Sequence, residues 1–180
     1  MYKYAFLANS AGLGPDKYSV TYENDRFCCY ISAVHGMKMP CEIAEKLAAE
    51  GFELIDLCGD FNLEKAEEIR KAADGKLNVC YAKYTEENQK KYDALESMNE
   101  YGIIIMGEGI GDKPEKLELR DDEYNTYVTI VGSDEMAKAA AKEMVAQGIH
   151  FIELCSYFDL EKAEAIADTV DRKVPFGYCG

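Results

Sequence analysis

The sequence lacks several features that membrane proteins and nucleic-acid-binding proteins need. No stretch approaches the ~20 consecutive apolar residues of a membrane-spanning helix, and the first ten residues alternate like a strand, without the apolar core of a signal peptide. Basic residues are few, since 20 Lys and Arg stand against 34 Asp and Glu, a formal net charge of −14. We therefore expect a cytoplasmic protein that binds neither membranes nor nucleic acid, because both present anionic surfaces.

Metal and thiol chemistry also lack their usual signals. Only two histidines are present and the acidic residues form no ligand-like cluster, so we expect no metal site. The seven cysteines are odd in number and form no C-x-x-C pair, which indicates reduced and mostly buried thiols. No motif identifies a cofactor, and the sequence leaves that question open.

An internal duplication dominates what the sequence does contain. When the chain is shifted by 97 positions without a gap, Gly51 falls on Gly148 and the run LEKAE at 63–67 falls on an identical run at 160–164. About two dozen aligned positions are identical, far more than chance gives an ungapped alignment. We predict a first repeat at residues 1–83, a connecting helix at 84–100 and a second repeat at 101–180.

Each repeat alternates strand-like and helix-like segments. Runs rich in β-branched and aromatic residues predict strands, and apolar stripes with a 3.6-residue period predict two helices. Gly51 and Gly148 suit left-handed helix C-termini, whereas Ser133, Asn62 and Asp159 suit helix N-caps. The order is ββαβαβ, which predicts an α/β fold with mostly parallel sheets, because strands joined through helices run parallel.

The predicted strands allow two arrangements. Duplication often fuses a symmetric dimer, so we place the repeats around a pseudo-twofold axis, as a monomeric pseudo-dimer or a homodimer. The alternative is closure of about eight strands into one barrel-like sheet, which is disfavoured because a (βα)₈ barrel needs a helix after every strand. In the connector, Tyr92, Leu95 and Met98 recur at i, i+3 and i+6, which favours a helix.

The clearest candidate site lies at the end of the third predicted strand of each repeat. Side chains alternate along a strand, so Asp56 shares a face with Cys58, and Glu153 shares one with Cys155. In parallel α/β sheets, ligands bind beyond the carboxyl ends of the strands. A carboxylate inside an apolar strand also needs a compensating partner. Asp56 and Glu153 are therefore either buried acceptors for backbone N–H groups or ligand-binding and catalytic acids.

Paired glycines follow the first strand in both repeats. Gly12 and Gly14 correspond to Gly109 and Gly111. No third glycine completes G-x-G-x-x-G and no helix follows directly, so a loop-shaping turn is favoured over a dinucleotide site. The retention of these glycines in both repeats still permits backbone contact with a ligand.

Short motifs carry a resemblance to a known family. They are Ala11-Gly12 after the first strand, Glu50-Gly51 at the end of the first helix, and the third strand, which reads IDLCGDF at 55–61 and IELCSYF at 152–158. On these motifs, each repeat resembles an uncharacterised bacterial domain-of-unknown-function family. The resemblance implies a shared fold and no activity. Ser156 replaces a glycine of the motif, so the two sites need not be equivalent.

Three functions remain open. The leading hypothesis is a small-molecule-binding protein with two related pockets, centred on Asp56, Cys58 and Phe61 in the first repeat and on Glu153, Cys155 and Phe158 in the second. The second is a cofactor-independent enzyme that uses Asp56 or Glu153 as general acid or base. The third is a fused pseudo-dimer acting as a protein interaction module, for which the 13 tyrosines supply apolar surface.

Overall fold

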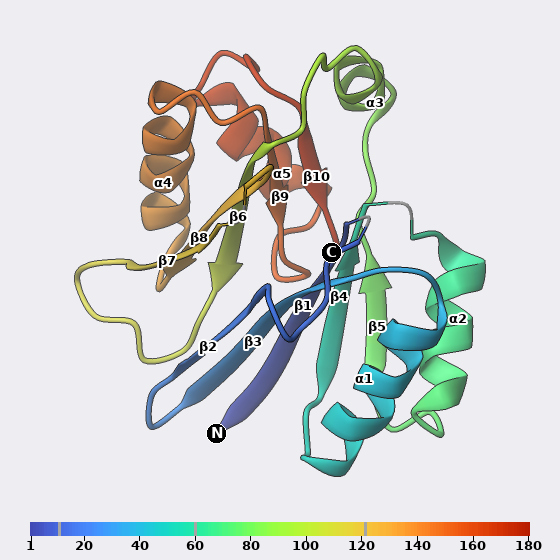
Figure 1. Cartoon of the computed structure of the whole chain (residues 1–180). Coiled ribbons are helices and arrows are strands. Elements are labelled where there is room, and N and C mark those ends of the chain that lie inside the picture. The colour runs from blue at the N-terminus through green and yellow to red at the C-terminus, as the bar shows by residue number, and fades with distance from the viewer. Residues whose placement is uncertain (11, 60, 121) are drawn as a thin grey trace. The chain divides into compact units, whose positions relative to one another are not determined.

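The computed structural model divides the chain into two compact units, Met1–Ala82 and Lys83–Gly180 (Figure 1). It describes residues 1–10, 12–59, 61–120 and 122–180. Two positions of the motifs discussed above, Ala11 and Asp60, lie outside the described residues.

The first unit is a five-stranded sheet with two helices. Its strands run in the spatial order β2-β3-β1-β4-β5, and all neighbours are parallel except β2 and β3. Both helices pack on the same face of the sheet (Figure 1). The elements are β1 (Tyr2–Asn9), β2 (Ser19–Glu23), β3 (Phe27–Val34), α1 (Lys38–Ala49), β4 (Leu54–Cys58), α2 (Leu63–Ala72) and β5 (Asn78–Tyr81).

The second unit repeats this topology. Its order β7-β8-β6-β9-β10 matches that of the first unit strand for strand, again with one antiparallel pair, β7 and β8. The elements are α3 (Glu86–Asp93), β6 (Glu100–Met106), β7 (Glu115–Arg120), β8 (Asn125–Val131), α4 (Asp134–Ala146), β9 (Phe151–Leu154), α5 (Leu160–Asp168) and β10 (Phe176–Tyr178). The prediction of tandem α/β repeats with mostly parallel sheets is confirmed. Within the described ranges, each sheet stays open, so the barrel alternative is wrong.

Each repeat contains one strand more than the sequence predicted. The segments read as polar loops contain β2 and β7, so the element order is βββαβαβ. Both are edge strands, and their side chains are largely exposed or half-buried. An edge strand with little buried surface does not need the apolar alternation that reveals a strand in a sequence, which explains the omission.

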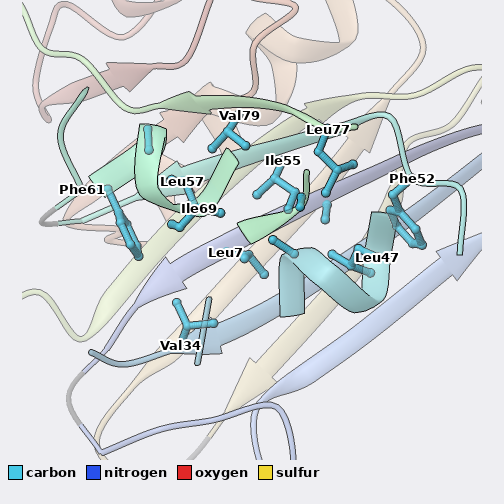
Figure 2. Packing of buried hydrophobic residues seen from close by; sticks show 14 of the residues in the cluster. Leu7, Val34, Leu47, Phe52, Ile55, Leu57, Phe61, Ile69, Leu77 and Val79 are labelled. Carbon is cyan, nitrogen blue, oxygen red and sulfur yellow. The ribbon is translucent and has the colours of Figure 1, made fainter. Parts of the chain in front are cut away.

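A cluster of apolar side chains fills the space between the first sheet and its helices (Figure 2). Ile55 and Leu57 of β4 are fully buried there, with Leu7 of β1 and Ile69 of α2. Because side chains alternate along β4, Asp56 must point to the opposite face of the sheet. The face that carries the predicted acidic site is therefore the face without α1 and α2.

The predicted helix ends are confirmed. Gly51 and Gly148 have positive φ angles of 79° and 87° directly after the C-caps of α1 and α4. The side chains of Asn62, Ser133 and Asp159 accept hydrogen bonds from the backbone N–H three residues later, at 3.0, 3.3 and 3.0 Å. Of the helices in the described ranges, none is long and apolar enough to cross a membrane.

Removal of a cap should measurably weaken the fold. We expect Asn62→Ala and Asp159→Ala each to lower the free energy of unfolding by about 1 kcal/mol, because each leaves an N–H of the first helical turn without its side-chain acceptor. Urea denaturation measures the change. Glu68→Ala, at an exposed interior position of α2, is the control. Equal stability of Asn62→Ala and Glu68→Ala would contradict the capping role.

The connecting helix is shorter than predicted and packs with the second unit. α3 covers Glu86–Asp93, whereas Leu95 and Met98, part of the predicted stripe, follow its end. The helix tightens there, because Leu95 N–H bonds to the carbonyl oxygen of Tyr92, three residues back. Asn88 Oδ1 accepts from Phe176 N–H at 3.2 Å, and Lys91 Nζ donates to the carbonyl oxygen of Arg172 at 2.8 Å.

Candidate functional site

The two acidic residues lie inside the sheets rather than at their edges. Asp56 is the third of five residues in β4 and is paired with Phe6 of the central strand β1. Glu153 is paired with Ile103 of β6 on one side and with Gly177 of β10 on the other. Both carboxylates are completely buried, at 0% exposure. Burial of a carboxylate is costly unless hydrogen bonds compensate, so the neighbouring donors decide its role.

Each buried carboxylate accepts a hydrogen bond from a tyrosine on the central strand. Tyr4 OH donates to Asp56 Oδ2 at 2.7 Å, and Tyr101 OH donates to Glu153 Oε2 at 2.8 Å. Such a hydrogen bond offsets part of the cost of burying the carboxyl group. Backbone N–H donors were one of the two alternatives that the sequence left open, and these tyrosines were not predicted as donors. A signal existed, since Tyr4 and Tyr101 are identical at the 97-residue offset and stand on the first strand of each repeat.

The second unit adds another tyrosine to its carboxylate. Tyr84, just before α3, donates its hydroxyl hydrogen to Glu153 Oε1. The tyrosine ring packs against the backbone of Gly177, where a Cβ atom would lie 2.8 Å from Tyr84 Cζ and 3.0 Å from Glu153 Cγ. Only glycine leaves room for this contact. The first repeat has Cys80 at the equivalent position, so its site is built differently.

The cysteines predicted beside these acids are buried thiols. Cys58 ends β4 at 4% exposure, and Cys155 follows β9 at 3%. Cys155 Sγ accepts a hydrogen bond from Met106 N–H at 3.2 Å. In the described part of the chain, none of the seven cysteines forms a disulfide. Thiols buried to this degree act as small packing groups, because a reactive thiolate requires access and charge stabilisation.

The structure places Phe61 and the predicted glycines away from the buried carboxylates. Phe61 belongs to the helix-side cluster, across the sheet from Asp56 (Figure 2). Phe158 is fully buried and packs edge-on against Tyr157. Gly109 and Gly111 are exposed, and a Cβ atom at Gly111 would meet open space.

The first glycine turn lies instead against the start of α1. Gly12 has a positive φ of 79°, and a Cβ atom at Gly14 would lie 3.2 Å from Met39 Cε. Leu13 O lies 2.5 Å from His35 Nδ1. The turn is thus fixed to the helix side of the sheet. Pro15, next to Gly14, and Met39 both line a groove that the sequence analysis did not anticipate.

This groove, the first-repeat groove, has a volume of about 890 Å³ and runs along α1 on the helix side of β2 and β3. Apolar side chains form much of its wall: Cys28, Tyr30, Ile43, Leu47 and Phe52. Charged side chains also line it: Lys3, Glu23, Glu42, Lys46 and Glu50. Its volume falls within the ~300–1,000 Å³ range of small-molecule sites in proteins.

The charged side chains of the groove differ in their contacts with other groups of the chain. Lys3 Nζ donates to the carbonyl oxygen of Glu50 at 2.8 Å, and Lys46 Nζ lies 3.8 Å from the Glu50 carboxylate. The pKa of the Cys28 thiol in the wall is raised, first by burial and next by the negative charge of Glu23, which outweighs the opposing effect of Lys3. The electrostatic environment at Cys28 is therefore acidic.

The second unit has a reduced counterpart of this groove, with a volume of about 70 Å³. Its walls include Tyr127, Ala140 and Met144, which correspond to Tyr30, Ile43 and Leu47 at the 97-residue offset.

An ion pair crosses the reduced groove. Lys116 Nζ on β7 lies 2.5 Å from Glu143 Oε1 on α4. The first repeat has Ser19 and Lys46 at these positions, so it cannot form the same bridge. The two repeats thus present one open and one bridged version of the same groove.

No feature of the sequence points directly to these grooves. Their apolar walls read as ordinary core positions, and the relevant difference lies at Ser19 and Lys116, in strands that the sequence analysis treated as loops. In the described part of the chain, no three His, Cys, Asp or Glu side chains converge as metal ligands would.

Comparison with known proteins identifies the repeats. Among curated proteins, none matches the chain. A family model described as a family of unknown function, DUF6506, matches twice, at residues 2–97 and 99–180. The two matches follow the internal duplication and together cover nearly the whole sequence. The chain therefore belongs to DUF6506, a family of unknown function, and carries two tandem copies of its domain.

Proposed function

We propose that this chain is a small-molecule-binding protein and that the first-repeat groove is its ligand site. The observation that carries the proposal is the contrast between the repeats, about 890 Å³ against about 70 Å³ at equivalent positions. Burial of apolar ligand surface against Tyr30, Ile43, Leu47 and Phe52 supplies the driving force. We place this function in the cytoplasm, because a chain with seven reduced cysteines suits a reducing compartment.

A fluorescent probe tests the proposal without knowledge of the natural ligand. N-phenyl-1-naphthylamine is uncharged at neutral pH and gains fluorescence in apolar sites. We expect saturable binding with one site per chain. The variant Ser19→Lys with Lys46→Glu copies the bridge of the second unit and should weaken probe binding roughly tenfold or more, a loss of about 1.4 kcal/mol.

A matched variant controls for the change of charge. Ser97→Lys with Lys71→Glu makes the same substitutions at exposed positions outside the groove. It should bind the probe like the wild type. Probe binding that does not saturate, or that survives groove closure unchanged, would refute the groove as the site.

The buried acids define a second candidate, general acid/base chemistry at Glu153. The observation in its favour is the placement of one carboxylate between the Tyr84 and Tyr101 hydroxyls, three groups that can exchange protons. Its complete burial argues for a structural role instead. The double variant Asp56→Asn with Glu153→Gln separates the two proposals, because groove binding of the probe should persist in it.

The interaction-module hypothesis has weaker support. Leu63 and Leu160, equivalent residues at the starts of α2 and α5, are exposed at 61% and 45%. Single exposed apolar residues are common on protein surfaces, so this pair does not amount to a docking patch.

A further inference from the structure

The charged side chains around the first-repeat groove indicate the class of its ligand. Building on the function proposed above, we propose that the groove binds an apolar molecule carrying an ammonium-type cation, and that the carboxylate of Glu23 binds the cation. Glu23 is the last residue of β2 and lines the groove. Its ladder partner is Cys28, so the two side chains lie on the same face of the sheet.

The other charged side chains of the groove already have partners. Lys3 and Lys46 both contact Glu50, at the C-terminal end of α1. Glu42 lies 3.5 Å from Lys38. Glu23 forms no ion pair with any of the described residues. Its carboxylate is the main negative charge that raises the pKa of the Cys28 thiol. A bound cation would pair with the exposed Glu23 carboxylate, whereas an anion would meet three glutamates and only two lysines, both already in contact with Glu50.

The aromatic residues of the wall favour the same ligand. Tyr30 and Phe52 both line the groove, and Phe52 already has Lys3 Nζ at 5.8 Å from its ring centroid. The π faces of such rings attract ammonium groups, whereas a carboxylate gains nothing from them. The formal charge of −14 adds a long-range attraction for cations. Apolar surface, an unpaired carboxylate and aromatic rings together select a cationic amphiphile over neutral or anionic ones.

The second repeat supports the assignment by contrast. At the position of Glu23 it has Arg120, whose guanidinium lies over the Tyr127 ring at 5.8 Å from the centroid. Tyr127 is the equivalent of Tyr30. In the second unit, an arginine of the chain itself thus lies over the ring of this tyrosine, as a ligand cation would lie over the Tyr30 ring in the first.

Competition with the uncharged probe tests this inference. Octylamine, octanol and octanoate share an eight-carbon chain and differ in charge at pH 7.5. We expect octylamine to displace N-phenyl-1-naphthylamine from the wild-type protein at concentrations roughly tenfold lower than octanoate, with octanol between them. Glu23→Gln should bring the amine and carboxylate within about threefold of each other. Glu45→Gln, on α1 but outside the groove, should keep the wild-type preference.

The outcomes separate the two proposals. If the probe binds and the three ligands compete equally, or if Glu23→Gln retains the preference for the amine, the cation assignment is wrong while groove binding stands. If the probe does not bind the wild-type protein, the proposed function itself fails. Probe affinity of the Glu23→Gln variant reports whether its groove is intact, because the probe carries no charge.

Discussion

Gly177→Ala is expected to lower the free energy of unfolding of the second unit by roughly 1–3 kcal/mol. A methyl group at this position would lie 2.8 Å from Tyr84 Cζ and 2.9 Å from the hydroxyl oxygen. Tyr84 is half-buried and can swing outward to relieve the clash, but Glu153 then loses one of its tyrosine donors. The cost therefore arises mainly from a weakened hydrogen-bond network around a buried carboxylate.

Urea denaturation measures this effect, and two further variants identify its cause. Gly111→Ala is the matched control, because a Cβ atom there meets open space and the backbone angle is not left-handed. Tyr84→Phe should be destabilising alone yet add little to Gly177→Ala, since both remove the same hydrogen bond. Full additivity of the two substitutions, or a stable Gly177→Ala protein, would show that Tyr84 does not depend on Gly177.

Tyr4→Phe should destabilise the first unit by about 1–3 kcal/mol, because Asp56 loses the hydroxyl that donates to it while its burial persists. Tyr101→Phe should act in the same way on Glu153. Removal of the buried carboxyl group as well should recover stability, so Tyr4→Phe with Asp56→Leu is expected to be more stable than Tyr4→Phe alone. Thermal and urea unfolding of the single and double variants provide the comparison.

Tyr157→Phe is the control for loss of a hydroxyl group, since Tyr157 is 46% exposed. It should have nearly wild-type stability. If Tyr4→Phe also leaves the free energy of unfolding unchanged, the Tyr4–Asp56 hydrogen bond does not stabilise the fold. A functional role for the buried acid is then favoured.

Local signals in the sequence were sufficient for the repeat and for its helices and inner strands. The caps at Asn62, Ser133 and Asp159 and the glycines after α1 and α4 act within a few residues of the chain, so their residue types reveal them. The parallel sheets followed from the alternation of strands with helices. The edge strands β2 and β7 were not predicted, because their side chains are largely exposed or half-buried and form no buried apolar run.

The sites depend on contacts between distant segments. Tyr4 and Asp56 are 52 positions apart and meet only because β1 and β4 are neighbours in a fixed register. The sequence identified the acids from their cost inside an apolar strand, but it could not supply that register. The first-repeat groove is even harder to predict from sequence, because its volume depends on the space left between α1 and the edge strand β2.

The first copy of the family domain and the first folded unit end at different residues, 97 and 82, and α3 lies between these two boundaries. The family domain in the first match runs to residue 97 and so includes Tyr84 and Asn88. In the folded protein these residues serve the second unit, through Glu153 and Phe176. The last strand of the second copy, where Gly177 leaves room for the Tyr84 ring, therefore depends on a residue from the tail of the first. A substitution in one copy can thus act through a side chain that belongs to the other.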